Sequence, residues 1–177
     1  MEAITCIETR RSVRKYKDTP IDRDTITKLV SLSQLAPTWK NTQTTRFTAI
    51  TDKAVLSKIA DTLGDWNRPI VGGAPLLMAV STVTKKSAYH SDGTPATIYG
   101  DAYTNFDCGA AVQTFCLAAH DMGIGTTILG MFDPAKVSAL IGIPEGRELI
   151  VLISCGYSNE TPPMHKRLDI AEVLKFI

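Results

Sequence analysis

The chain has 177 residues, of which 44% are hydrophobic, with 19 Lys and Arg against 18 Asp and Glu. A chain of this length buries roughly 70% of its unfolded surface in one core, so we expect a single domain spanning residues 1–177. The near balance of charge excludes a general attraction to nucleic acid or to anionic membranes and leaves local clusters to bind anions.

Local patterns in the first half predict alternating helices and strands. Ile4 and Ile7 share one face of a short helix, and Asp22 and Asp52 stand where helix caps are needed. Pro37 marks the end of the second helix. The expected elements are helices at 2–9, 22–36 and 52–63 and strands at 46–51 and 74–83, followed by a polar loop or lid at 85–103.

The second half contains the longest predicted helix, at residues 105–122. Its only polar stripe runs through Asp107, Thr114 and Asp121, so it either lies in the middle of a core or forms a large subunit interface. The remaining predictions are a strand at 126–130, a helix that Asp133 caps, a strand at 148–156, and a last short helix with a capping box of Asp169 and Glu172.

Several familiar site types are absent from the sequence. The glycines at 123, 125 and 130 do not complete a dinucleotide fingerprint, because Ile128 stands where the third glycine is required. There is no phosphate-binding loop and no nucleophile elbow, and the histidines lack the spacing of metal ligands. We therefore expect no resident metal.

The cysteines and the chain's start bear on the compartment. Glu2 comes before any apolar run, and no uncharged stretch approaches the roughly 18 apolar residues of a membrane span. The four cysteines, Cys6, Cys108, Cys116 and Cys155, are dispersed without a C-x-x-C pair, which predicts buried free thiols. We expect a soluble, cytoplasmic protein.

A dense group of positive charge lies in "TRRSVRKYKDTP", residues 9–20. Guanidinium groups match phosphate oxygens with paired hydrogen bonds, and a serine hydroxyl can donate to the same group. Arg10, Ser12 and Arg14 alternate, so an extended segment would direct all three to one side. The residues alone leave two interpretations open, an anion site and an ordinary solvated basic run.

Four stretches, in this order and at these separations, resemble the FMN-dependent nitroreductase family: "RRSVRKYKDTPI", "LAPTWKNTQTTRF", "DCGAAVQTFCLAAHDMGIGTTILGMF" and "GIPEGRELIVLISCGYSNETPPMHKRL". The resemblance covers nearly the whole chain. It implies an α+β, three-layer sandwich in which helices flank a central, mostly antiparallel sheet. It also implies an intertwined homodimer that binds FMN in two clefts at the subunit interface.

The resemblance assigns two groups of residues to the FMN phosphate and the polar parts of the cofactor. Arg167, with His165 or Lys166 beside it, would approach the phosphate from the far end of the chain. The first group, which would hold the phosphate, the ribityl chain and the polar edge of the ring, is Arg10, Arg11, Ser12 and Arg14. Asn67 matches only loosely a polar flavin contact of the family, and a surface turn is the preferred interpretation there.

A second set of residues would reach the flavin ring. The resemblance gives backbone contact beside the hydride-accepting nitrogen to Ile128, Leu129 and Gly130, although the residues alone favour a buried strand. The family loop that reaches the flavin from the partner subunit matches Pro37, Thr38, Trp39, Asn41 and Gln43. Asn41 alone would fit an ordinary turn residue, but the order of the motifs favours the flavin role. Threonines at 44 and 45 replace the family's aromatic anchor.

The function implied is an NAD(P)H-dependent flavin oxidoreductase that reduces nitro compounds, quinones or similar small acceptors by alternating hydride transfer on FMN, without a catalytic side chain. One alternative keeps FMN but changes the reaction to dehalogenation, flavin fragmentation or alkene reduction. The other is a nonenzymatic module that binds anions or nucleic acid, which the balanced total charge disfavours. We expect neither a nucleic acid nor a membrane as partner.

Overall fold

The computed structural model describes residues 1–177, and its sheet has four antiparallel strands in the order β1-β2-β4-β3. The strands are β1 (Thr45–Ile50), β2 (Leu76–Val83), β3 (Ile124–Leu129) and β4 (Arg147–Tyr157). The apolar runs that predict buried strands form the two central strands, β2 and β4, which neighbours cover on both sides. β1 and β3 are therefore the edges.

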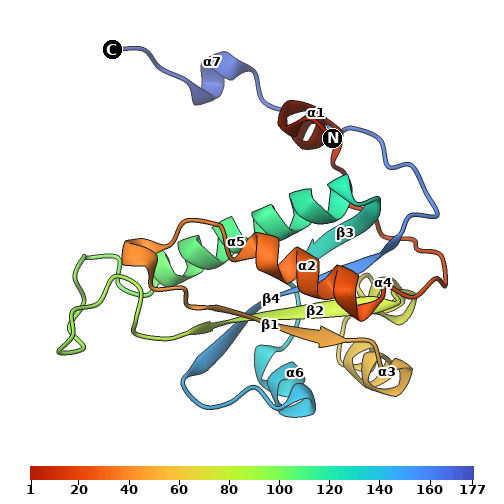
Figure 1. Ribbon diagram of the computed structural model, residues 1–177, viewed down its shortest axis with the longest axis horizontal. Helices are drawn as coiled ribbons and strands as arrows, with labels where there is room; N and C mark the ends of the chain where they lie inside the picture. The colour runs from red at the N-terminus through yellow and green to blue at the C-terminus, as the bar shows by residue number, and fades with distance from the viewer.

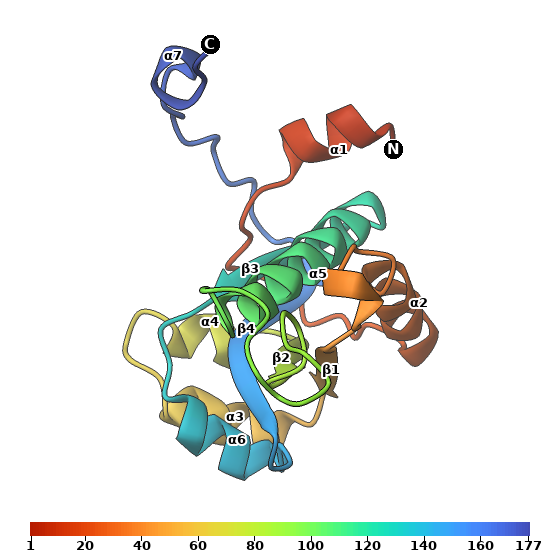
Figure 2. The ribbon, with the colours of Figure 1, turned by 90° about the vertical axis from the view of Figure 1, so that its left-hand side faces the viewer.

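Helices cover both faces of this sheet, which makes three layers (Figures 1 and 2). One face carries α2 (Arg23–Ser33) and α5 (Ala102–Asp121), and the other carries α3 (Lys53–Asp61), α4 (Arg68–Gly72) and α6 (Pro134–Ile141). Each face has its own apolar core. One core surrounds Phe115 and Leu29, and the other, which we call the lower core because it lies below the sheet in Figure 1, surrounds Ile59 and Leu152. The α+β class with helices flanking an antiparallel sheet is confirmed.

Helix starts follow the local chemistry of the sequence closely. The aspartate side chains at the predicted caps all accept backbone N–H bonds: Asp22 from Thr25, Asp52 from Ala54 and Val55, Asp133 from Ala135 and Lys136, and Asp169 from Ala171. The predicted capping box with Glu172 is present in α7 (Ile170–Val173). A side-chain cap pairs N–H groups of the first turn that would otherwise have no partner, so local sequence alone determines where these helices begin.

Some boundaries and two short elements differ from the prediction. α2 ends at Ser33 rather than near residue 36, and α5 begins at Ala102, ahead of the predicted start at residue 105. The short 3-10 turn η1 (Trp39–Asn41) and helix α4 were not predicted. α4 has Pro69 in its first turn and only five residues, too few for a helix to be stable by itself. The burial of its Ile70 and Val71 in the lower core therefore stabilises it.

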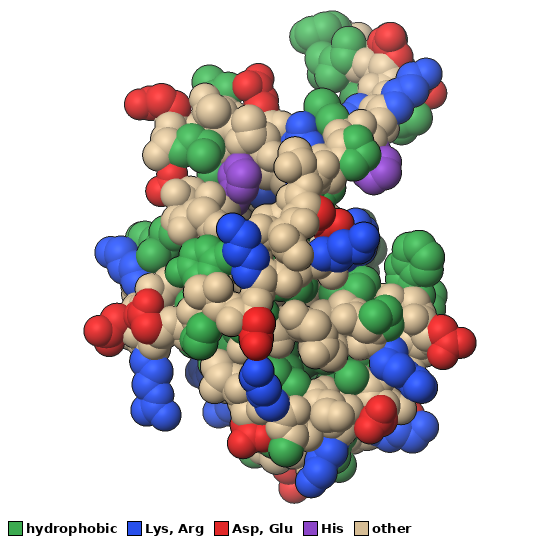
Figure 3. Space-filling model, turned by 90° about the vertical axis from the view of Figure 1, so that its right-hand side faces the viewer, with side chains coloured by type: hydrophobic (Ala, Val, Ile, Leu, Met, Phe, Trp, Pro, Cys, Tyr) green, Lys and Arg blue, Asp and Glu red, His purple; other side chains and the backbone are tan.

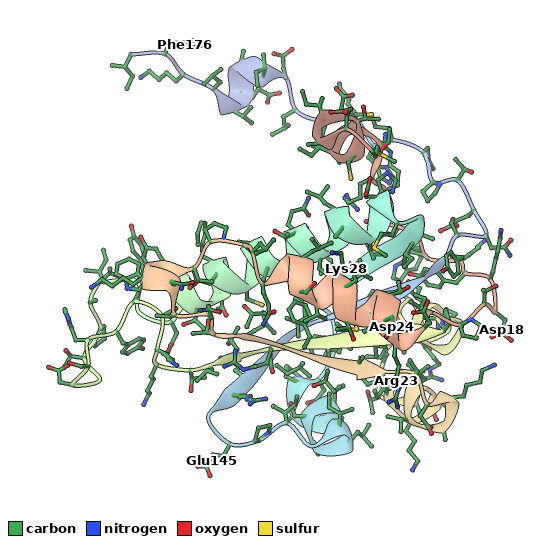
Figure 4. The ribbon with its side chains drawn as sticks, in the orientation of Figure 1. Asp18, Arg23, Asp24, Lys28, Glu145 and Phe176 are labelled. Carbon is green, nitrogen blue, oxygen red and sulfur yellow. The ribbon has the colours of Figure 1, made fainter.

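The two ends of the chain project from the layered body. α1 (Ala3–Thr9) buries only Cys6 and leaves Ile4 and Ile7 exposed. Residues 161–177, which we call the C-terminal arm, are exposed almost throughout. Figure 4 shows Phe176 at the far tip of the arm with no other element beside it. None of the helices has the length and apolar character needed to span a membrane.

Candidate functional site

The basic segment of residues 10–14 lies along the free edge of β3. The chain leaves α1 at Arg10 in an extended conformation, and Ser12 forms a parallel bridge with Thr126. The Val13 N–H donates to the Thr126 carbonyl at 3.0 Å, and the Thr127 hydroxyl donates to the Val13 carbonyl. The edge strand therefore fixes the backbone of the basic segment.

Close packing supports this arrangement. Gly125 lies under Val13, and a methyl group at residue 125 would come within 2.7 Å of the Val13 Cβ. The Tyr16 hydroxyl lies 2.5 Å from the Val13 carbonyl oxygen and 2.7 Å from Ser154 Oγ. Burial raises the pKa of the Tyr16 hydroxyl far above its ordinary value, so it remains protonated and can donate.

The arginines of this segment have no carboxylate partner within the chain. The ion pairs of the structure involve Met1, Lys53 and Lys136 only. The Arg14 guanidinium makes a single weak contact, 3.3 Å to the Ser12 carbonyl oxygen, and its side chain is exposed. Uncompensated guanidinium groups beside a hydroxyl are suited to a bound anion.

Two further groups, Glu160 and His120, lie beside the basic segment. The Glu160 carboxylate accepts the backbone N–H of Arg14 at 2.6 Å and that of Lys15 at 3.2 Å, so it orders the backbone and leaves the guanidinium free. Burial, followed by the charges of Arg10 and Arg11, lowers the pKa of His120. His120 therefore remains neutral near pH 7, and its ring nitrogen lies 2.9 Å from Thr9 Oγ1.

The end of β3 offers an open surface beyond the basic segment. Ile128 is 45% exposed, so the interpretation of its side chain as buried was wrong, whereas Leu129 does lie in the lower core. Gly130 follows with no side chain, and its neighbour Met131 accepts a 3.0 Å bond from the Asn67 amide. Asn67 lies in a turn as expected, but it is 8% exposed, so the expectation that this turn lies at the surface was wrong.

The loop of residues 37–43 has an unusual backbone. Lys40, Asn41 and Gln43 all have positive φ, at 44°, 56° and 49°. The Gln43 N–H donates to the Thr38 hydroxyl at 3.2 Å, and the Trp39 ring meets Tyr103 edge to face with centroids 4.8 Å apart. Asn41 is thus a turn residue, as one alternative expected, and its side chain is exposed, which leaves it free for a ligand.

One chain does not bring the two halves of the predicted site together. The Trp39 N–H donates a hydrogen bond to the Asp107 carboxylate near the start of α5, whereas the Cys6 thiol donates one to the Leu117 carbonyl near its end. The stretch of helix from Asp107 to Leu117 spans roughly 15 Å. In Figure 1 the orange turn η1 lies at one end of α5 and α1 lies near the other.

The third predicted group lies on the C-terminal arm. His165, Lys166 and Arg167 are exposed, and the Arg167 guanidinium contacts only the His165 carbonyl, at 3.4 Å. Figure 3 shows α1 and the arm projecting above the body, with Lys and Arg side chains on the same face of the molecule. Within one chain the structure does not join Arg167 to the basic segment.

Sequence reasoning missed three residues that organise these parts. Tyr16 and Glu160 fix the basic segment, and Asp107 anchors the loop of residues 37–43. Asp107 was expected on a polar stripe, but it is 1% exposed. The sequence did carry one signal for Asp107, an acidic residue in a helix that is otherwise mostly apolar. No local pattern indicated the roles of Tyr16 and Glu160.

The model of the Nitroreductase family matches residues 7–157, which covers most of the chain. The chain belongs to the Nitroreductase family. It is accordingly an enzyme of a family of NAD(P)H nitroreductases and related oxidoreductases. The match includes the basic segment, the loop of residues 37–43 and β3.

Two curated relatives are similar over most of their length. A protein of Archaeoglobus fulgidus named as an NADH dehydrogenase/NAD(P)H nitroreductase is 29% identical over 174 residues, covering 95% of this chain and 92% of its own. A protein of Rhodospirillum rubrum named 5,6-dimethylbenzimidazole synthase is 26% identical, covering 88% of this chain and 81% of its own. Relatives in the Nitroreductase family therefore differ in the reactions that their names give.

Solved structures match the fold. A nitroreductase family protein from Streptococcus pneumoniae superposes with a TM-score of 0.87 at 22% identity and covers 98% of this chain and 99% of its own. A Desulfovibrio desulfuricans structure described as a nitroreductase in complex with FMN has a TM-score of 0.80 at 23% identity and covers 98% of this chain and 95% of its own. The α+β layers of this chain are thus a fold of the Nitroreductase family.

Proposed function

We propose that the chain is an FMN-dependent oxidoreductase that uses NAD(P)H to reduce nitro compounds, quinones or similar small acceptors by alternating hydride transfer. The observation that carries the proposal is the group of arginines without carboxylate partners, held on the edge of β3 beside its open end. Membership of the Nitroreductase family and a relative solved with FMN support it.

The residues of this end of the molecule fit FMN. Arg10, Arg11, Ser12 and Arg14 offer guanidinium groups and a hydroxyl that would hold a dianionic phosphate and the polar edge of a flavin, joined by Arg167 and His165. Ile128 is exposed and Gly130 lacks a side chain, so the backbone of residues 128–130 is accessible to a flat ring. A leucine at residue 129 keeps that strand anchored in the core.

When bound, FMN supplies the hydride-transfer chemistry between nicotinamide and acceptor. The chain itself needs no nucleophile or obligatory base, because its task is orientation and charge. Arg14 would place a positive charge beside the polar end of the ring, where negative charge develops. Its lack of an internal carboxylate partner leaves that charge uncompensated.

The complete site requires a second copy of the chain. The loop of residues 37–43 and the basic segment lie toward opposite ends of α5, so one subunit would supply the basic segment and its partner the loop. The C-terminal arm exposes apolar side chains that nothing in this chain covers: Leu168, Ile170, Val173, Leu174 and Phe176. Burying them on a second subunit would yield an intertwined homodimer with two sites.

The test of cofactor and reaction begins with the purified protein. A yellow preparation that releases FMN on heating and bleaches with NADH or NADPH in the absence of oxygen supports the proposal. Arg14→Ala should lose FMN more readily and slow the bleaching, whereas Lys15→Ala, at the exposed neighbouring position, should match the parent protein. Failure of the protein to bind added FMN would defeat the proposal.

The dimer has its own test. Val173→Asp, which places a charge on an arm residue that is 64% exposed, should shift the mass measured by light scattering from dimer to monomer and reduce FMN content together. Ala139→Asp, on the exposed surface of α6, is the matched control and should remain dimeric. A parent protein that is monomeric yet retains FMN would contradict the shared site.

One alternative reaction has a specific observation in its favour. The Rhodospirillum rubrum relative is named for 5,6-dimethylbenzimidazole, a compound whose dimethyl-substituted benzene ring is also part of a flavin. Fragmentation of the flavin would consume the yellow colour permanently after readmission of oxygen, whereas electron transfer to an acceptor would restore it. A colourless protein with a salt-dependent nucleic-acid complex would instead indicate a binding module.

A further inference from the structure

Asp107 carries a carboxylate in the interior of the protein without a basic partner. Its side chain belongs to α5 and is 1% exposed. It accepts the Trp39 N–H at 3.0 Å and 3.2 Å and the Ser87 hydroxyl at 2.5 Å. A buried charge is tolerated only where donors satisfy it, so these two contacts are essential to its presence there.

The two contacts come from the segments with the most unusual backbone in the chain. Non-glycine residues with positive φ occur at Lys40, Asn41, Gln43, Lys85 and Ala88 and nowhere else. All lie within four residues of Trp39 or Ser87. Such conformations are unfavourable for residues with a side chain, and they persist where the surroundings impose them and are concentrated at functional sites.

Aromatic side chains pack beside the backbone that this carboxylate anchors. Trp39 meets Tyr103 edge to face, and Tyr103 in turn contacts Tyr99 and Phe106 at centroid distances of 6.1 Å and 6.3 Å. Tyr99, Tyr103 and Phe106 line an apolar hollow of about 320 Å³ with Ala102. Movement of the Trp39 backbone would alter the packing beside this hollow.

We propose that Asp107 is a positioning residue that holds the loop of residues 37–43 and the segment of residues 85–88 in one fixed arrangement, and that this arrangement sets the affinity for the electron acceptor. The second half of this inference rests on the proposed function, since it requires the loop to lie beside bound FMN. The first half concerns the chain alone.

The decisive variant is Asp107→Asn, which keeps the size of the side chain. Its carbonyl oxygen can replace the carboxylate oxygen that accepts both Trp39 and Ser87, but it carries no full charge, and the amide N–H groups then face the Trp39 N–H where the other oxygen accepts it at 3.2 Å. We expect the KM for a quinone such as menadione to rise about tenfold, because these hydrogen bonds lose the assistance of the charge. kcat at saturating acceptor should change much less.

Two further variants separate positioning from general stability. Thr104→Val is the matched control, because Thr104 lies on α5 one turn before Asp107 and its buried hydroxyl has no partner. It should leave KM unchanged. Ser87→Ala removes one donor and should raise KM by less than Asp107→Asn does. The KM of the double variant Ser87→Ala/Asp107→Asn should be only slightly higher than that of Asp107→Asn, because the two residues act through one contact.

A purely structural role would give another result. If Asp107→Asn lowered the melting temperature but left KM and kcat of the folded, FMN-loaded enzyme unchanged, the inference would be overturned. Should Asp107→Asn fail to fold, Ser87→Ala, which keeps the carboxylate and its Trp39 bond, provides the same test at residues 85–88. An unchanged KM in that variant would likewise overturn it.

Trp39 fluorescence keeps this test independent of the proposed function. Trp66 is the other tryptophan and is 78% exposed, so Trp66→Phe leaves Trp39 as the reporter of the loop. In this background Asp107→Asn should increase acrylamide quenching of Trp39, and Thr104→Val should not. A protein that fails to bind FMN or oxidise NAD(P)H defeats the proposed function, while unchanged quenching defeats the positioning role.

Discussion

Replacement of Gly125 by alanine tests whether the edge of β3 positions the basic segment. The new methyl group would lie 2.7 Å from both Val13 Cβ and Val13 Cγ2 and 2.9 Å from Val13 Cγ1. Val13 Cβ is attached directly to the backbone, so it cannot turn away and the segment itself must move.

Two estimates of the cost agree. Overpacking of this kind costs about 1–3 kcal/mol. If the segment lifts instead, it loses the Val13 N–H bond to Thr126 and the Thr127 bond to the Val13 carbonyl, at roughly 1 kcal/mol each. We therefore expect a loss of about 2 kcal/mol and a fall in melting temperature of roughly 4–8 °C. FMN affinity should fall with it, because the arginines move.

The free energy of unfolding, measured by chemical denaturation, should be compared for Gly125→Ala in the parent protein and in a variant with a smaller residue 13. Val13→Gly removes all three atoms that the new methyl group would meet, so the cost of Gly125→Ala should be smaller in that background than in the parent protein. Gly64→Ala is the control, because a methyl group there meets nothing within 4 Å. An equal cost of Gly125→Ala in both backgrounds would refute the reasoning, as would the absence of any cost.

Two other outcomes follow from buried groups. Thr44 is fully buried with an unpaired hydroxyl, so Thr44→Val should raise the free energy of unfolding by about 1 kcal/mol; a loss measured by urea denaturation would show that the hydroxyl has a partner. Burial raises the pKa of the Cys108 thiol from 9.0 to about 12, so the folded state holds the thiol proton more tightly than the unfolded state does. The contribution of this proton to the free energy of unfolding is complete below pH 9 and declines as the pH rises toward 12. Unfolding midpoints of the parent should therefore fall more steeply above pH 9 than those of Cys108→Ala, and parallel slopes would contradict this.

The parts of the fold set by local chemistry could be predicted from the sequence. Asp22 and Asp133 each cap a helix because the donors lie within three residues of the carboxylate. The central strands are recognisable because neighbours cover both their faces, which requires an apolar run. Helix α4 could not be found in this way, because burial of its Ile70 and Val71 depends on the distant lower core.

The site was predictable in composition and less so in arrangement. The order of four stretches implied which residues belong together, but not that Ile128 would be exposed, since this depends on how far α5 covers β3. Asp107 could not be placed either. Its donors, Trp39 and Ser87, are 68 and 20 positions away in the chain, and no local pattern links a carboxylate to such partners.

The contacts of the basic segment also constrain the order in which the protein folds. Residues 13–15 are made well before their partners, because Thr127 follows Val13 by 114 positions and Glu160 follows Arg14 by 146 positions. Contacts between such distant positions form slowly, because a long loop must close first. During synthesis the arginines therefore remain in solvent until β3, β4 and Glu160 have been made, so the segment becomes ordered for anion binding only after residue 160 has been added.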